Sequence, residues 1–243
     1  KAAPPARDFL GALRAAAAAT GRPGLIAEVK KASPSKGVIQ PDFDPVRIGA
    51  AYAAGGAACL SVLTDAKFFQ GAFENLSLIR GAGVPLPLLA KEFVVEAYQI
   101  FKARAAGADA VLLIAAVLPN SDMDYLVKAA RSVGMQCLIE VHSEAELARV
   151  LRLPGGLAGC MLGINNRNLE DFTVDLALTE RIMASAPGRA AAAAGMLVAG
   201  ESGIFTPADV ARVAGAGCGA ILVGESLVKQ GDPAAGVRAL LEL

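Results

Sequence analysis

Short apolar runs alternate with longer amphipathic stretches from one end of the chain to the other. The short runs are apolar at successive positions, which is typical of parallel strands that are buried on both faces. The strands predicted in this way are Leu25–Lys30, Ala58–Leu63, Pro87–Lys91, Ala110–Ile114, Gln136–Glu140, Met161–Asn165, Leu197–Glu201 and Ala220–Gly224. Amphipathic spacing predicts helices between them, around residues 45–55, 72–82, 95–106, 122–133, 143–152, 174–186, 207–215 and 233–241.

Turn and cap residues mark the ends of several predicted elements. The phrases AAGGAACLSVL, AAGADAVLLI and GAGCGAILVG each contain a glycine suited to a left-handed turn, followed by a strand. Ser121, Ser143 and Thr206 precede predicted helices and are suited to capping them. A further helix beginning near Arg7 and continuing through Ala15–Ala19 makes residues 1–23 an N-terminal helical extension. The alanine run Ala190–Ala194 is predicted as a loop or an extension of the sixth helix.

The repeating strand and helix units indicate the fold class. An open, doubly wound sheet would show the same alternation, but no G-x-G-x-x-G motif follows the first strand. Eight evenly spaced units in 243 residues favour closure into a barrel. The prediction is therefore an α/β protein with a single (β/α)8 TIM-barrel domain over residues 1–243, without a second domain or a linker.

Charge and apolar content exclude several classes of partner. The chain has 23 Lys and Arg against 23 Asp and Glu, so no net field favours nucleic acid or an anionic membrane. The longest apolar run, Ala110–Leu118, is too short to span a bilayer. These features predict a soluble protein with a small-molecule partner, no nucleic acid and no membrane.

Cysteine and histidine content restricts the chemistry. The four cysteines lie far apart in apolar stretches and are predicted to be reduced core thiols; they are Cys59, Cys137, Cys160 and Cys218. The single histidine, His142, is predicted in a loop or at a helix start, and a multi-histidine metal site is excluded. Acid–base chemistry must then come from lysine and glutamate.

Charged residues stand at the C-terminal ends of predicted strands, where TIM barrels carry their active sites. They include Lys30, Lys91, Glu140 and Glu201, and alternation places Glu28 on the same face as Lys30. Any single one of these residues is equally well explained as a strand-end residue that faces solvent or forms a structural ion pair. Their joint placement favours a functional cluster in which neighbouring charges shift one another's pKa values.

The seventh and eighth units predict a phosphate site. Glu201-Ser202-Gly203 and Gly224-Glu225 each lead from a strand into a helix start, where backbone N–H groups favour an anion. Ser33, in the loop after the first strand, can close over the same group with Lys30 or Lys36 nearby. Each glycine alone is also an ordinary turn former.

The motifs IAEVKKASPSKG, CLSVLTD, LLAKEF, LIEVH, LGINNRNLEDF, VAGESGI and ILVGESL, in this order, resemble the indole-3-glycerol phosphate synthase family of tryptophan biosynthesis. The resemblance runs from about Leu25 to the C-terminus. It implies a decarboxylating lyase that converts 1-(o-carboxyphenylamino)-1-deoxyribulose 5-phosphate to indole-3-glycerol phosphate without a cofactor or metal. It is also compatible with association with other tryptophan-pathway enzymes.

The resemblance implies roles for individual residues. Lys91 corresponds to the general acid, Glu140 to its acid/base partner in dehydration, and Lys30 to the cation that fixes the substrate carboxylate and can also act as an acid. Glu28 would orient the lysines. The remaining implied contacts are Asn165, Glu201 and Ser202 at the sugar, Arg167 at the carboxylate, Ser33, Gly203, Gly224 and Glu225 at the phosphate, and Phe69, Phe93, Leu112 and Leu169 at the anthranilate ring.

The chain departs from the family pattern in two places. Glu92 stands where many members have aspartate, and we expect its side chain to face away from the mouth. About two dozen residues precede the first strand, so we expect part of the helix that usually covers the barrel mouth to be missing. The segments VLPNSD, GINNRNLEDF and GESGIFTP are similar to those of plant and algal members, and this resemblance implies a location in the chloroplast stroma. If the resemblance does not hold, the expected location of the protein is cytoplasmic.

Other functions fit parts of the pattern. An aldolase-like lyase or isomerase on the same barrel would use Lys91 or Lys30, in the aldolase case as a Schiff base. Phosphoribosylanthranilate isomerisation is disfavoured, because its usual acid–base pair is a cysteine and an aspartate. A barrel that binds a metabolite without turnover would have no use for the paired acids and bases.

Overall fold

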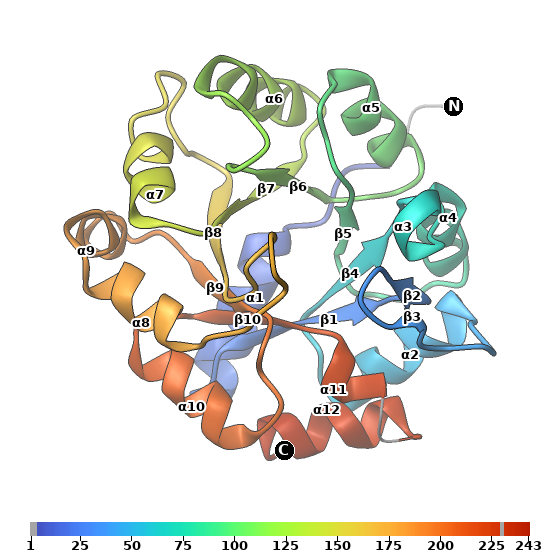
Figure 1. The fold of residues 1–243 in the computed structure, drawn as a ribbon. Helices are drawn as coiled ribbons and strands as arrows, with labels where there is room; N and C mark the ends of the chain where they lie inside the picture. The colour runs from blue at the N-terminus through green and yellow to red at the C-terminus, as the bar shows by residue number, and fades with distance from the viewer. Residues whose placement is uncertain (1–3, 229–230) are drawn as a thin grey trace.

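Parallel strands close into a barrel in the computed structural model, which describes residues 4–228 and 231–243 (Figure 1). The barrel strands are β1 (Gly24–Val29), β4 (Cys59–Leu63), β5 (Leu88–Lys91), β6 (Ala110–Ile114), β7 (Gln136–Val141), β8 (Cys160–Asn165), β9 (Val198–Glu201) and β10 (Ala220–Val223). Strand β1 pairs in parallel with both β4 and β10, which excludes an open sheet. The predicted TIM barrel is confirmed.

Helices surround the barrel on its outer side (Figure 1). Those predicted from the sequence are α2 (Pro45–Gly55), α4 (Phe73–Gly81), α5 (Ala97–Ala105), α6 (Asn120–Ser132), α7 (Glu144–Val150), α8 (Ala177–Ala184), α10 (Pro207–Gly215) and α12 (Pro233–Leu241). The loop after β1 carries a short hairpin, β2 (Ala32–Ser33) with β3 (Gly37–Val38). Two further single-turn helices, α3 (Ala66–Phe69) and α11 (Glu225–Val228), follow β4 and β10. The helix start after Gly224 was predicted, whereas the hairpin and α3 were not.

Local signals set most helix ends. Ser143 accepts a hydrogen bond from the Glu146 backbone N–H, and Thr206 forms a capping box with Asp209, as predicted. Gly107 follows α5 with φ +103°, the left-handed turn expected there. The prediction for Ser121 was wrong, because α6 already begins at Asn120 after Pro119 and places the serine inside its first turn.

The second alanine run lies mostly in a helix of its own, α9 (Ala186–Ala193), rather than in a loop or an extension of α8. Ser185 has an extended backbone, which ends α8, and its hydroxyl accepts from the Gly188 N–H to cap α9. Proline in the first turn of α9 suits a helix start. Alanine then continues the helix.

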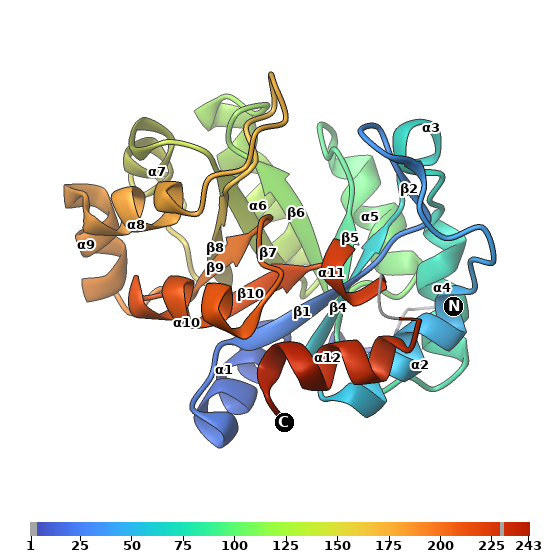
Figure 2. The same cartoon turned by 60° about the horizontal axis from the view of Figure 1, so that its bottom comes forward.

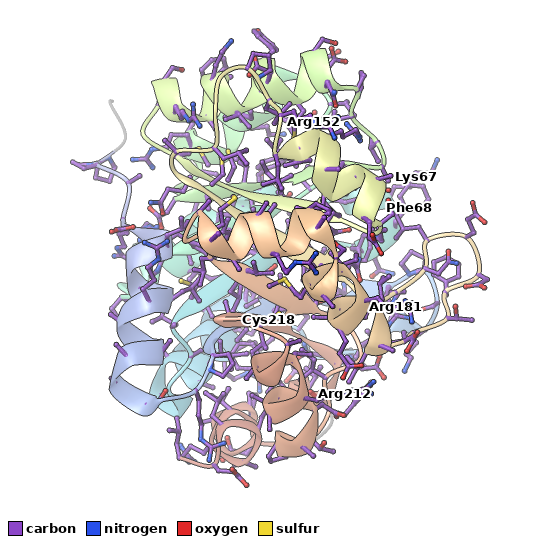
Figure 3. All side chains as sticks on the ribbon, turned by 90° about the vertical axis from the view of Figure 1, so that its left-hand side faces the viewer. Lys67, Phe68, Arg152, Arg181, Arg212 and Cys218 are labelled. Carbon is purple, nitrogen blue, oxygen red and sulfur yellow. The ribbon has the colours of Figure 1, made fainter. Side chains whose placement is uncertain are left out.

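Apolar side chains fill two layers. The outer layer packs strands against helices, and the inner layer fills the barrel with residues such as Ile26, Leu138 and Met161. All four cysteines are free and buried, which confirms their prediction as core thiols. The outer faces of the helices carry charges instead, such as Arg181 and Arg212 (Figure 3). In the described part of the chain, no helix combines the length and apolar character that crossing a bilayer requires.

Helix α1 (Phe9–Thr20) closes the end of the barrel opposite the strand C-termini (Figure 2). Its side chains Phe9, Leu10 and Leu13 belong to the same apolar cluster as the barrel interior. The described residues before β1 therefore do not cover the mouth. Their apolar side chains are buried at the bottom of the barrel, where they complete the inner layer.

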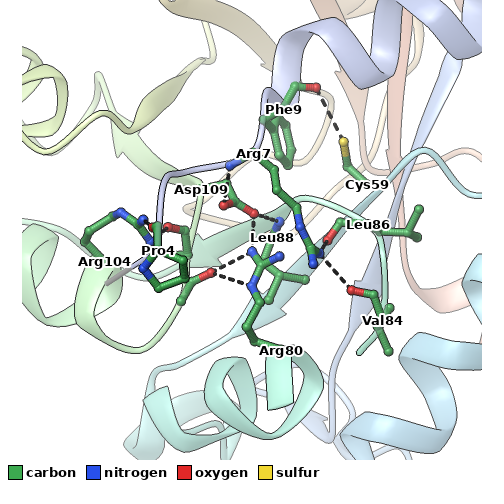
Figure 4. A network of polar contacts seen from close by, with 12 residues as sticks. Pro4, Arg7, Phe9, Cys59, Arg80, Val84, Leu86, Leu88, Arg104 and Asp109 are labelled. Atoms are coloured by element: carbon green, nitrogen blue, oxygen red, sulfur yellow. Dashed lines mark hydrogen bonds and ion pairs between the residues drawn. The ribbon is translucent and has the colours of Figure 1, made fainter. Parts of the chain in front are cut away.

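A buried aspartate joins the N-terminal segment to this bottom end (Figure 4). The Asp109 carboxylate accepts hydrogen bonds from the backbone N–H groups of Arg7 and Leu88, each at 2.8 Å, and pairs with Arg80. The Arg7 guanidinium in turn donates to the carbonyls of Val84 and Leu86. Three segments of the chain are thus held by one side chain.

Candidate active site

A cavity of about 480 Å³ opens at the C-terminal ends of the barrel strands. Every residue predicted for the site lines it: Glu28, Lys30, Ser33, Phe69, Lys91, Phe93, Leu112, Glu140, Asn165, Arg167, Leu169, Glu201, Ser202, Gly203, Gly224 and Glu225. These residues come from β1 and every later strand end except that of β4, together with the loops that follow. Parallel strands bring their ends to one rim, which is why such distant positions meet.

Lys91, the last residue of β5, lies among carboxylates from other strands. Its Nζ atom is 3.7 Å from Oε2 of Glu28 on β1 and 3.8 Å from Oε2 of Glu201 on β9. Lys30 forms an ion pair with the other oxygen of Glu28. Glu28 thus contacts both lysines, and alternation predicted that it shares a face with Lys30.

The charges of this cluster hold Lys91 in its cationic form. Burial alone would lower the pKa of Lys91, but Glu28, Glu201 and Glu140 together raise it above its ordinary value. The mutual effect of the charges, expected from the sequence, thus raises the pKa of this lysine. Burial likewise opposes ionisation of Glu28, yet the charges of Lys30 and Lys91 hold its pKa below the ordinary value.

Among the carboxyl groups that line the cavity, Glu201 is one of the most deeply buried. It is 1% exposed, and burial together with the charge of Glu140 raises its pKa to about 8, against the opposing effect of Lys91. A neutral Glu201 can donate its proton to the neighbouring Glu140. The space for its side chain comes from Gly163 on β8, where a Cβ atom would lie 1.9 Å from Oε1 of Glu201.

The raised pKa of Glu201 makes folding stability depend on pH. The folded chain retains a proton on Glu201 that the unfolded chain loses above the ordinary glutamate pKa, so we expect the free energy of unfolding to fall between about pH 4.5 and 8. Denaturant titrations at several pH values in this window should show the decline. Glu201→Gln, which stays neutral in both states, should flatten it; an unchanged pH dependence in that variant would contradict the assignment.

Glu140, on β7, lies two strands from Lys91 on β5 and lines the same cavity. Its Oε1 atom accepts a hydrogen bond from Nδ2 of Asn165 on the neighbouring strand β8, at 3.0 Å. The imidazole Nε2 of His142 lies 3.3 Å from the same oxygen. His142 occupies the loop between β7 and α7, as predicted, but its contact with Glu140 was not anticipated. Strand alternation, which puts residues 140 and 142 on one face, was the available signal.

An apolar wall lines the same cavity as the charged cluster. The Phe69 and Phe93 rings lie with centroids 6.3 Å apart, next to Leu112 and Leu169 on the cavity surface. Further apolar residues line the cavity and were not predicted, among them Phe68, Ile114 and Phe172. Phe172 ends the quoted motif LGINNRNLEDF, and its carbonyl accepts from Arg167 at 3.4 Å. A flat, apolar ligand fits this wall.

Backbone groups form the opposite end of the cavity. Ser202 and Gly203 have φ values of +64° and +79°, and a Cβ atom at position 203 would lie 2.5 Å from Val174. These residues and Gly224 lie with Ser33 around the same cavity. Lys36 reaches across from the β2–β3 hairpin and pairs with the Glu225 carboxylate. The predicted phosphate residues thus come together at one end.

Glu92 differs from the expectation that it faces away from the mouth. Its side chain lines the cavity and accepts a hydrogen bond from the Thr64 hydroxyl at 2.8 Å. The chain turns out of β5 after Lys91, so strand alternation no longer applies at this position. Within the described ranges, no group of three or more His, Cys, Asp or Glu side chains is arranged to hold a metal ion.

Comparison with known proteins agrees with the resemblance seen in the motifs. A family model described as indole-3-glycerol phosphate synthase matches residues 1–240. The chain belongs to this family. A chloroplastic indole-3-glycerol phosphate synthase of Arabidopsis thaliana is 56% identical over 98% of the chain, and the chain spans 58% of that relative's length. The synthase of Microcystis aeruginosa is also 56% identical, over 99% of the chain and 78% of the relative.

Solved structures share the fold with this family member. A 3-hexulose-6-phosphate synthase from Salmonella typhimurium has a TM-score of 0.64 at 15% identity, covering 90% of this chain and 97% of that one. A thiamine phosphate pyrophosphorylase from Pyrococcus furiosus also has a TM-score of 0.64, at 16% identity over 90% of this chain and 94% of that one. At these identities the likeness supports the barrel architecture alone.

Proposed function

We propose that the chain is a carboxy-lyase that closes the indole ring of indole-3-glycerol phosphate, a step of tryptophan biosynthesis. Its substrate would be 1-(o-carboxyphenylamino)-1-deoxyribulose 5-phosphate. The observation that carries the proposal is the position of Lys91, a partly buried cation between Glu28 and Glu201, with Glu140 lining the same cavity. Membership of the family supports the same reaction.

The first step forms a carbon–carbon bond. The aromatic carbon that bears the carboxylate attacks the ketose carbonyl carbon, and Lys91 donates a proton to the carbonyl oxygen as it becomes a hydroxyl. The positive charge that develops on the aniline nitrogen and ring then accepts the electron pair released when CO₂ departs. A lysine whose pKa is raised stays protonated before the step and stabilises the developing oxyanion electrostatically.

The second step removes water. The nitrogen lone pair expels the new hydroxyl group, which needs a proton as it leaves, and Lys30 lies at the same cavity to supply it. Glu140 then accepts a proton from the adjacent carbon, and the electron pair of that carbon–hydrogen bond completes the indole double bond. The apolar wall of Phe69 and Phe93 would hold the anthranilate ring, and the glycine-rich end would hold the phosphate.

A Schiff-base aldolase is disfavoured by the electrostatics of the same site. Attack on a carbonyl by lysine requires the neutral amine. The pKa of Lys91 is raised by three carboxylates, which keeps the amine protonated and non-nucleophilic. The same arrangement that makes Lys91 a stable proton donor therefore makes it a poor nucleophile.

The proposal is tested by adding the substrate to the purified chain without metal or cofactor and following indole absorbance and fluorescence. The chain contains no tryptophan, so its background emission is low. Formation of indole-3-glycerol phosphate with release of an equal amount of CO₂ is the expected result. A folded chain that binds the substrate without forming product would contradict the proposal and favour a binding-only barrel.

We also propose a chloroplast location and association with other tryptophan-pathway enzymes. The location is supported by the 56% identity to the chloroplastic Arabidopsis synthase. Fractionation of the source cells with an antibody to this chain would test the location. Co-purification with pathway enzymes from the same extract would test the association.

A further inference from the structure

His142 is the only histidine of the chain and stands at the edge of the proposed acid–base pair. Its side chain is 13% exposed and lies behind Glu140 rather than on the cavity surface, since it is not among the lining residues. The Nε2 atom is 3.3 Å from Oε1 of Glu140. This is the long end of the hydrogen-bond range, and such contacts often shorten when a substrate binds.

A second carboxylate fixes the orientation of the imidazole. Oε2 of Glu146, in the first turn of α7, accepts a hydrogen bond from the His142 backbone N–H at 2.7 Å and lies 3.7 Å from Nδ1 of the ring. Both ring nitrogens are shielded from solvent, and neither has a hydrogen-bond partner of good geometry among the described residues. The carboxylates of Glu140 and Glu146 are therefore the acceptors that the ring nitrogens face.

The contacts of Glu140 are concentrated on one of its oxygens. Oε1 accepts from Asn165 at 3.0 Å and faces His142 from another direction. Side chains from two different elements, β8 and the loop after β7, therefore meet at this oxygen. The second oxygen is then available to the substrate, and Glu201 lies close enough for the charge of Glu140 to raise its pKa.

We propose that His142 is a positioning residue for Glu140, acting by donation from Nε2–H to Oε1. This inference rests on the proposed function. His142 keeps the second oxygen of Glu140 aligned with the carbon that loses a proton during dehydration. The residue does not itself contact the substrate. Misplacement of a catalytic group by about 1 Å can cost about 100-fold in rate, so the effect should appear in kcat.

Three substitutions separate donation from packing. In His142→Gln the side-chain amide nitrogen can occupy the place of Nε2, whereas in His142→Asn it occupies the place of Nδ1, facing Glu146. We expect His142→Ala and His142→Asn to lower kcat about 10- to 100-fold with KM little changed, and His142→Gln to retain most of the turnover. Equal losses in all three variants at unchanged melting temperature, or no loss in any, would overturn the proposal.

A second measurement does not depend on turnover. Because the chain has one histidine, protein labelled with ¹⁵N-histidine gives one pair of ring nitrogen signals. We expect Nε2 to carry a proton and its signal to shift in Glu140→Gln, while the exposed-site substitution Glu144→Gln leaves it unchanged. An Nε2 signal that does not shift in Glu140→Gln would overturn the contact, even if the enzyme is active. If the unaltered chain formed no indole product, the proposed function would be contradicted. The histidine NMR measurement would still test the contact between His142 and Glu140.

Discussion

Replacing Lys91 with methionine is expected to lower kcat by about 10²- to 10⁴-fold, the range for loss of a general acid. Methionine keeps the length of the side chain but removes the proton donor and the positive charge. The lost charge also faces the developing oxyanion, so the electrostatic contribution disappears with the proton. The measurement is steady-state indole formation, with substrate binding followed separately so that KM and kcat are distinguished.

The fold should tolerate this substitution, because the cluster can adjust its protonation. Lys91 opposes the raised pKa of Glu201, so its removal favours the neutral form of Glu201 further, and Lys30 still pairs with Glu28. Lys128→Met, on the exposed face of α6 where Lys128 pairs with Asp124, is the matched control and should leave kcat unchanged. Turnover of Lys91→Met within about threefold of the control would remove Lys91 from the general-acid role.

The barrel could be predicted because its requirements are repeated along the sequence. Each strand must be apolar on both faces, so residues such as Leu25 to Ala27 and Val111 to Leu113 identify strands without knowledge of their neighbours. The site could be located for a related reason. A charged residue such as Glu140 or Glu201 at the end of a buried strand requires a partner, and closure of the barrel brings those partners to one rim.

Features that depend on distances between segments could not be predicted in this way. The sign of the Lys91 pKa shift follows from three carboxylates on three strands, whereas the sequence shows only that both signs of charge are present. The hairpin of β2 and β3 and the turn of α3 are each too short to have a periodic pattern. The position of α1 under the barrel likewise depends on where its apolar face is buried, and the sequence predicts only that such a face exists.

Replacing Asp109 with alanine is expected to destabilise the fold by about 3–5 kcal/mol, the cost of removing one partner of a buried ion pair. Asp109 is 1% exposed, and its carboxylate is the acceptor for Arg80 and for the backbone N–H groups of Arg7 and Leu88. The Arg80 side chain is only 18% exposed. Alanine at position 109 would leave its charge without this carboxylate, and both backbone N–H groups without their acceptor. The measurement is urea unfolding followed by circular dichroism.

Two comparisons identify the source of this loss. The Arg7 and Leu88 N–H groups bond to different oxygens of Asp109, so Asp109→Asn keeps an acceptor for only one of them and removes the charge. It should therefore fall between the unaltered chain and Asp109→Ala. Asp42→Ala breaks a pair with Arg47 whose aspartate side chain is 93% exposed, and should change stability little. If Asp109→Ala were as stable as Asp42→Ala, the buried network would not hold the N-terminal segment. Because α1 completes the inner apolar layer, we instead expect loss of Asp109 to loosen the bottom of the barrel before the catalytic rim.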